Sequence, residues 1–259
     1  LIVEIIDMGD DRYRVAIEDN GPGIVKAQIP KIFAKLLYGS KFHTLKQSRG
    51  QQGIGISASV MYGQLTTGRP ARIISKIGPN HPANEIELKL DTVKNKPLII
   101  SQKETQWHKP HGTRIEIDLE GTYISGRQSV DQYIQQTAII NPHVTLIYQP
   151  PKGSQIMFVR ATEKVPRQAK EIKPHPYGVE LGRLMKMLRY TEYRTIQAFL
   201  TNEFARVGSG TAKQICENGA ILPSTKPKKM TRELAEQLMK GIKETKIINP
   251  PADCISPKI

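Results

Sequence analysis

The chain of 259 residues carries 38 lysines and arginines against 24 aspartates and glutamates, a net charge of +14. Its length suffices for two domains with separate cores, and the charge surplus favours a polyanionic partner over an acidic small molecule, with simple solubility as the alternative. Two cysteines, Cys216 and Cys254, are too few for a disulfide framework or a zinc site, which favours a reducing compartment. No apolar run approaches the ~20 residues of a membrane span.

The chain begins with a predicted β-hairpin. Residues 1–7 and 13–18 alternate between apolar and polar side chains, and residues 8–12 supply a turn rich in Gly and Asp. The motif Asp19-Asn20-Gly21-Pro22-Gly23 follows directly. Here one carboxylate stands on a tight turn, where it can accept the exocyclic amine of adenine, and glycines leave room for a flat base. Taken alone, the motif also fits an ordinary turn.

A helix over residues 28–38 is predicted next, from apolar residues at helical spacing. Residues 39–52 are polar and basic, which is typical of a mobile lid over phosphates or of a surface loop. The run Gly50-Gln51-Gln52-Gly53-Ile54-Gly55 then leads into a helix expected over residues 55–66, whose amides and positive dipole end suit an anion. The run lacks the Lys-Ser/Thr pair of a P-loop, so by itself it also fits close packing.

From residue 73 the pattern changes to period two. Strands are predicted over 73–77, 85–90, 98–100, 113–119, 144–149 and 156–161, with a helix over 129–140. Consecutive strands with short links pair antiparallel, and the alternation leaves one face wet and the other covered by helices. We therefore predict an α+β chain whose residues 1–162 form a two-layer α/β sandwich. His108 and His111 are two potential metal ligands, but no third ligand lies nearby in the sequence, so no metal site is predicted there.

Residues 163–177, rich in Lys and Pro, are predicted to be a linker, and residues 178–259 a small all-helical domain. The second part is the more basic, with a net charge of +8 over residues 163–259 against +6 over residues 1–162. Four apolar stripes at helical spacing support the helices: Leu181, Leu184, Met185 and Leu188; Ile196, Phe199, Leu200 and Phe204; Ala212, Ile215 and Cys216; Leu234, Leu238 and Ile242.

A turn between two of these helices contains Gly208 and Gly210, with Ser209 or Thr211 as the expected helix cap. Exposed amides there, with cations nearby, can hold a nucleic-acid backbone. We expect duplex contacts through phosphates, with little sequence preference; ordinary solvated turns are the alternative. The residues concerned are Arg206, Lys213, Lys226, Lys228 and Lys229.

The two glycine motifs resemble, in order and spacing, those of the gyrase, heat-shock chaperone, histidine-kinase and MutL ATPases. The run from Ile29 to Phe42, continued from Gln47 to Ala58, narrows the resemblance to the B subunits of archaeal type IIB DNA topoisomerase VI, over nearly the whole chain. The resemblance implies the Bergerat ATPase fold, followed by a helix-two-turns-helix domain similar to that of DNA-repair glycosylases.

In that family the Asp of the first motif contacts adenine, and a Ser-Lys pair and a Gly-x-x-Gly-x-Gly loop surround the nucleotide. A later Gly-Thr, here Gly112 and Thr113, closes the adenine pocket. The resemblance thus implies ATP, with Mg²⁺, as cofactor. The residues it implies as ATP contacts are Asp19, Gly21, Gly23, Ser40, Lys41, Gly50, Gln51, Gln52, Gly53, Ile54, Gly55, Ile56, Ser57 and Thr113.

Parts of the family pattern are not in this sequence. A helix with the catalytic Glu beside a magnesium-binding Asn precedes the first strand in the family, whereas this chain opens on Leu1–Ile6. A transducer domain, whose lysine reaches the γ-phosphate, is expected beyond Ile259. We therefore interpret the chain as a fragment, with neither a catalytic residue nor a metal ligand of its own.

The resemblance implies the ATP-hydrolysing component of a DNA topoisomerase, cytoplasmic and associated with the nucleoid, without membrane contact. ATP would order the lid at residues 39–57 and dimerise two B subunits. A DNA duplex would then pass through a double-strand break made by the A subunit of an A2B2 heterotetramer, relaxing supercoils. Two alternatives stay open: a MutL-like or gyrase-like ATPase, against which the helical module counts, and a nucleic-acid-binding scaffold with a non-hydrolysing nucleotide site.

Overall fold

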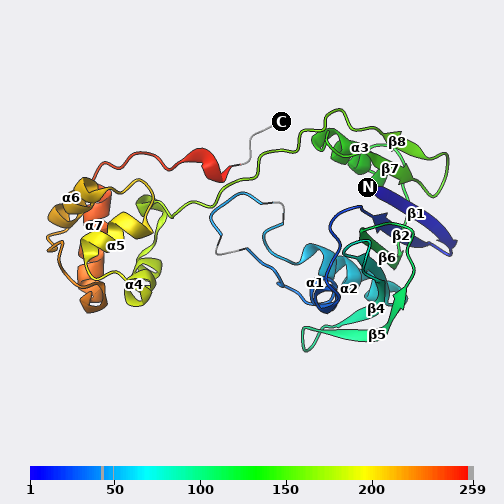
Figure 1. Ribbon diagram of the computed structural model, residues 1–259, viewed down its shortest axis with the longest axis horizontal. Helices are drawn as coiled ribbons and strands as arrows, with labels where there is room; N and C mark the ends of the chain where they lie inside the picture. The colour runs from blue at the N-terminus through cyan, green and yellow to red at the C-terminus, as the bar shows by residue number, and fades with distance from the viewer. Residues whose placement is uncertain (42–43, 49, 256–259) are drawn as a thin grey trace. The chain divides into compact units, whose positions relative to one another are not determined.

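The computed structural model describes residues 1–41, 44–48 and 50–255, which divide into two compact units (Figure 1). The first unit holds the described residues up to 41 and those from 50 to 165. The second holds residues 44–48 and everything described from 166 onward. The boundary thus falls at residue 165, and most of the predicted linker, from residue 166 to 177, belongs to the second unit.

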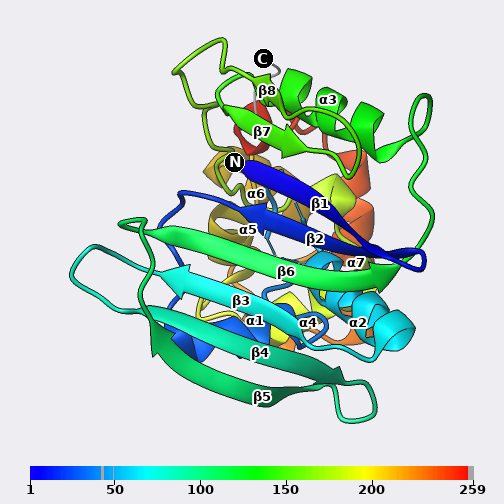
Figure 2. The same ribbon diagram turned by 90° about the vertical axis from the view of Figure 1, so that its right-hand side faces the viewer.

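An eight-stranded mixed sheet forms the first unit, in the order β5-β4-β3-β6-β2-β1-β7-β8 (Figure 2). All neighbours are antiparallel except β1 and β7. The sheet differs from the expected consecutive pairing in one respect, since β6 does not pair with β5 but inserts between β3 and β2. The strands are β1 (Ile2–Gly9), β2 (Arg12–Glu18), β3 (Ala71–Lys76), β4 (Ala83–Asp91), β5 (Lys96–Thr105), β6 (Gly112–Glu120), β7 (Leu146–Gln149) and β8 (Ile156–Phe158).

Helices cover one face of this sheet, as predicted for a two-layer sandwich (Figure 2). The strand registers place Val3, Ile17, Ile115, Ile73 and Ile86 in one row across that face. Most of this row is buried, because apolar side chains of alternate residues leave water together. The covering elements are η1 (Lys26–Gln28), α1 (Ile29–Phe33), α2 (Gly55–Thr67) and α3 (Val130–Ile140).

The opposite face of the sheet carries ion pairs. Arg14 binds Asp118 through two hydrogen bonds of 2.7 and 3.0 Å, and Arg114 contacts Glu4, Glu18 and Glu116. The hydrogen bond from Arg14 holds the pKa of Asp118 below its usual value. Asp118, Glu18 and Glu116 are largely buried, and these pairs give each of them a cationic partner.

The predicted helix over residues 28–38 is wrong in its second half, since α1 ends at Phe33. Leu37 has a positive φ of 64°, a conformation that an α-helix does not accommodate. A contact from far along the chain fixes this segment: the Asn95 side chain accepts from Leu36 N (2.8 Å) and donates to Leu36 O (3.2 Å). Local periodicity is thus overridden by tertiary hydrogen bonds.

The second unit is helical. Its core is formed by residues that include Leu184, Leu188, Phe199 and Phe204, and the last two rings meet edge to face at 5.6 Å. The elements are η2 (Pro176–Gly178), α4 (Leu181–Tyr190), α5 (Ile196–Glu203), α6 (Ser209–Asn218), η3 (Pro227–Lys229), α7 (Arg232–Glu244) and η4 (Ala252–Cys254).

Two details of this unit differ from what the sequence predicts. Met187 packs against the core, whereas Met185, predicted to be part of the buried stripe, is 36% exposed. The N-cap of α6 is Gly208, which has no side-chain cap; Ser209 is the first helical residue. Cys216 is fully buried, as a small hydrophobe would be.

Part of the predicted lid belongs to the second unit. Leu45 O accepts from Ile172 N (3.1 Å), and Gln47 N donates to Cys254 O (2.7 Å). Residues 42, 43 and 49 of the predicted lid lie outside the described residues. Within the described ranges, no helix combines the length and the apolar character that crossing a membrane requires.

Candidate functional site

The Asp19 turn is held where the end of β2 meets the start of β6. Asp19 N donates to Thr113 O (2.9 Å), which extends the β2–β6 ladder by one residue. The Oδ1 atom of Asp19 accepts from Gly21 N (2.8 Å) and from Thr113 N (3.1 Å). The second carboxylate oxygen, Oδ2, has no hydrogen-bond partner in the described part of the chain. One oxygen is thus fixed by backbone amides, and the other is left to accept a ligand donor.

Two glycines of this turn are required by the packing itself. Gly23 has φ +71°, and a Cβ there would lie 2.0 Å from Lys76 O. Gly112 has φ +137°, and its Cβ would lie 2.3 Å from Asp19 O. Any side chain at either position would push the turn away from the strands. The glycines therefore bring the Asp19 turn into backbone contact with β3 and β6.

Ser75 supports the same turn, although the sequence-based predictions do not include it. Its side chain is fully buried, accepts from Ile24 N (2.8 Å) and contacts Thr113 Oγ1 (2.9 Å) and Gly112 O (3.1 Å). A signal was present in the sequence: Ser75 carries a hydroxyl at a position that alternates with Ala71 and Ile73, the apolar residues on the buried face of β3.

The loop before β6 is fastened to the turn by two further contacts. His111 Nδ1 donates to Gly21 O (2.8 Å), so this histidine has a structural partner in the turn. Lys109 forms an ion pair with Glu18, the residue before Asp19. Burial by itself would raise the pKa of Glu18, but the hydrogen bonds from Lys109 and Arg114 outweigh it and lower that pKa.

The glycine-rich loop pairs with the segment that contains Ser40 and Lys41. Lys41 N donates to Gln51 O (2.7 Å), and Leu37 N donates to Gly53 O (3.0 Å). Gly53 has φ +69°, and a Cβ there would lie 2.6 Å from Tyr38 O. Two backbone hydrogen bonds thus bring the segment of the predicted Ser-Lys pair next to the predicted phosphate loop. Gly50 also has a positive φ, and Gln52 is exposed.

Helix α2 begins at the end of this loop. Its N-cap, Ile54, provides no side-chain hydrogen bond, so the first-turn amides from Gly55 onward have no side-chain cap. Ser57 differs from the other loop residues because it is fully buried, and its hydroxyl donates back to Ile54 O (3.2 Å). Its contribution to a ligand is therefore restricted to the backbone amide, and Ile56 packs against the core.

The chemistry of these two groups fits ATP. Ile24, directly after the Asp19 turn, and Ile56, in the first turn of α2, pack against the same apolar core. That core therefore lies between a hydrogen-bond acceptor suited to adenine and uncapped helix amides suited to phosphates. For Mg²⁺ the described residues offer no group of three or more His, Cys, Asp or Glu side chains.

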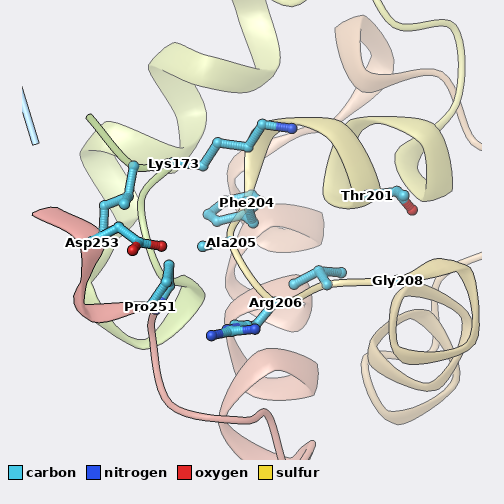
Figure 3. A pocket seen from close by; sticks show the side chains of 10 residues that line it. Lys173, Thr201, Phe204, Ala205, Arg206, Gly208, Pro251 and Asp253 are labelled. Atoms are coloured by element: carbon cyan, nitrogen blue, oxygen red, sulfur yellow. The ribbon is translucent and has the colours of Figure 1, made fainter. Parts of the chain in front are cut away.

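In the helical unit, the predicted DNA contacts fall on different surfaces. Arg206, which has a positive φ of 64°, lines a depression of about 650 Å³ together with Lys173, Gly208 and Asp253 (Figure 3). Lys228 lines a separate groove of about 610 Å³ beside α4. The remaining three predicted cations, Lys213, Lys226 and Lys229, are exposed.

Several curated sequences, all named as B subunits of type 2 DNA topoisomerase 6, are similar to this chain. That of Methanococcoides burtonii is 51% identical over 99% of the chain, that of Archaeoglobus fulgidus 46% over 96%, and that of Natronomonas pharaonis 50% over 84%. The chain spans 42%, 41% and 27% of those sequences, respectively. No family model matches the chain.

Two solved structures show a weaker likeness. The Aquifex aeolicus MutL ATPase domain complexed with ADP gives a TM-score of 0.39 at 16% identity, covering 62% of this chain and 57% of that one. The topoisomerase IV ATP-binding domain of Francisella tularensis gives a TM-score of 0.34 at 17% identity, covering 61% and 42%.

The sheet with helices on one face places the first unit in the class of two-layer α/β sandwich domains, with the Asp19 turn and the glycine-rich loop before α2 as its candidate site. Within that class, the chain belongs to the family of type 2 DNA topoisomerase 6 B subunits.

Proposed function

We propose that this chain supplies the ATP-binding part of a topoisomerase VI B subunit, and that Asp19 recognises adenine. The observation that carries the proposal is that the two oxygens of one carboxylate differ: Oδ1 is fixed by Gly21 N and Thr113 N, while Oδ2 has no hydrogen-bond partner among the described residues. An exocyclic amine is a donor that this free acceptor matches. Thr113 N holds Asp19 Oδ1, and Gly112 lies against Asp19 O, so these two residues position the acceptor.

The phosphate side of the proposed site is the loop that precedes α2. We assign the phosphate contacts to backbone amides between Gly50 and Ser57. Those from Ile54 to Ile56 suit an anion best, because no side chain caps the helix there. Ser40 and Lys41 join this loop through the Lys41–Gln51 backbone pair, and the Lys41 ammonium adds a positive charge. When bound with Mg²⁺, ATP supplies the free energy of phosphoryl transfer. This chain's own residues bind and orient the nucleotide.

The partners follow from the family as proposals. Two B subunits dimerise when ATP is bound, and a DNA duplex passes through a break made by an A subunit in an A2B2 assembly. The helical unit, proposed to be a helix-two-turns-helix domain, contacts duplex phosphates through Arg206, Lys213, Lys226, Lys228 and Lys229. The net charge of +8 over residues 163–259 supports this, because phosphate contacts by cations drive sequence-independent binding.

A calorimetric titration tests the nucleotide proposal. A non-hydrolysable ATP analogue with Mg²⁺ is titrated into the chain and into a version extended upstream by the helix that the family implies. We expect binding to the extended version, with the chain alone weaker or silent. Absence of binding to both would refute the ATP site and leave a nucleic-acid-binding scaffold as the better account.

A salt titration of duplex binding tests the DNA contacts separately. Each lost phosphate contact should reduce the slope of log K against log salt by about one. The Arg206→Ala and Lys213→Ala variants address the cations on either side of the turn before α6, and Lys226→Ala with Lys229→Ala address those at η3. An unchanged slope in both sets would place the DNA elsewhere on the molecule.

A further inference from the structure

A groove with an apolar floor runs beside α4 and η3 in the helical unit. Its volume is about 610 Å³. Its lining includes three apolar side chains, Met185, Leu188 and Met230, which we call the floor, and three cations, Lys186, Arg189 and Lys228, which we call the walls. The nucleotide proposal does not use any of these residues, and the DNA proposal uses only Lys228.

Helix α4 presents two different faces. Leu184 and Leu188 are buried in the helical core, with Met187 packed against it. The residues that line the groove include Gly182, Met185, Lys186 and Arg189, at positions i, i+3, i+4 and i+7, which share one side of a helix. This second face leaves Met185 36% exposed. Unbranched thioethers adapt to many apolar partners, so Met185 and Met230 make a floor suited to an inserted side chain.

The walls of the groove are strongly cationic. Its lining residues include three cations, Lys186, Arg189 and Lys228, and no acidic residue. The ion pairs of the described residues in α4, η3 and α7 are both on α7, Arg232–Glu236 and Lys240–Glu244. Lys186, Arg189 and Lys228 are therefore available for a partner's negative charges.

We propose that this groove binds an acidic peptide segment of a partner protein. The segment inserts an apolar side chain between Met185 and Met230 and directs its carboxylates at Lys186, Arg189 and Lys228. The apolar floor favours a peptide over a nucleic acid, because apolar residues stabilise a complex only where the ligand brings apolar surface of its own to bury against them. The groove offers a single aromatic ring, Tyr190, whereas single-stranded nucleic acids bind to several stacked rings.

The groove can be filled without disturbing the fold. A Cβ at Gly182 meets no atom within 4 Å, so Gly182→Leu projects into the groove. Gly210→Leu is the matched control, because Gly210 is likewise the second residue of its helix, has the same open space and does not line the groove. Lys186→Glu with Arg189→Glu reverses two wall charges. Arg183→Glu with Lys243→Glu changes the net charge equally at exposed positions outside the groove.

The probes are fluorescein-labelled twelve-residue peptides, measured by fluorescence anisotropy on the whole chain at about 0.15 M salt, where long-range attraction is screened. The first contains ten glutamates and two leucines, and the second has serines in place of the leucines. A twelve-base-pair duplex and a single strand serve as nucleic-acid probes. Lys228 is left unchanged in all variants, because it also belongs to the DNA proposal.

We expect the leucine peptide to bind at least tenfold more tightly than the serine peptide. Gly182→Leu and the Lys186/Arg189 double variant should each weaken it at least fivefold, while both controls keep the wild-type affinity and circular dichroism spectrum. Equal affinity for the two peptides would overturn the proposal, since charge alone would then explain binding. So would groove variants that weaken duplex or single-strand binding and leave peptide binding unchanged. Retained peptide affinity in Gly182→Leu would equally reject this groove.

Discussion

Replacing Asp19 by Asn tests the adenine contact with little change of shape. The amide oxygen of an asparagine can still accept from Gly21 N and Thr113 N, the two bonds of 2.8 and 3.1 Å that fix the turn. The amide nitrogen takes the place of Oδ2 and presents a donor where the exocyclic amine of adenine also donates. A hydrogen bond to a charged acceptor is replaced by a donor facing a donor. The expected loss of nucleotide affinity is therefore at least about 1.5 kcal/mol, slightly more than tenfold in Kd.

The assay is calorimetric titration of the ATP analogue, with the thermal midpoint recorded for each protein. Asp7→Asn is the matched control, because Asp7 Oδ1 accepts from Gly9 N (2.9 Å) in the same i to i+2 geometry, at the end of β1. We expect both variants to keep the wild-type melting temperature, and only Asp19→Asn to lose nucleotide affinity. Unchanged nucleotide binding in Asp19→Asn would refute the assignment, and equal losses in both variants would show a general effect of turn asparagines.

Three further outcomes can be measured. Gly63→Ala should lower the free energy of unfolding of the first unit in urea by about 1–3 kcal/mol, since the added Cβ would lie 2.5 Å from Ile117 Cγ2. Gly55→Ala in the same helix is the control, because a Cβ there meets open space; an equal loss in this variant would contradict the prediction. Stability should be constant well above pH ~4 and fall as acid protonates carboxylates whose folded pKa values are lowered; a flat profile down to pH ~3 would disagree. Those carboxylates are Glu18, Glu85, Glu116 and Asp118. Burial raises the pKa of Cys216 to about 11, so at mildly alkaline pH a thiol reagent should modify Cys254 quickly and Cys216 only after denaturation; two fast thiols would contradict the buried position.

The lowered carboxylate pKa values also indicate that added salt should reduce the stability of the folded state. Because these groups are charged and paired in the folded state above their unfolded pKa of about 4, the pairs contribute to stability at neutral pH. The pairs on the sheet face involve partly exposed arginines, so screening reduces that contribution at high ionic strength.

Much of the molecule was predictable from local patterns. The strand and helix segments follow from apolar periodicity, and the Asp19 turn and the glycine-rich loop follow from residues with special backbone freedom. These signals are local, because the period of a strand or helix and the φ preference of glycine depend on neighbours in sequence. They correctly placed the hairpin ahead of Asp19 and the start of α2 after Gly53.

Tertiary structure decided what connects distant parts of the chain. Asn95 ends α1 early by hydrogen-bonding Leu36, 59 residues away, and β6 separates from β5 to lie beside β2. Only that insertion brings Thr113 within hydrogen-bond distance of Asp19, 94 residues earlier, and adds Ser75 beneath them. Likewise, the helical period of α4 does not say which methionine is buried. The positions of the neighbouring helices decide that Met187 packs against the core and that Met185 stays exposed. The sequence determined the elements and the candidate residues, whereas pairing across the sheet determined which of them meet, because hydrogen bonds and packing between distant segments leave no periodic trace in the chain.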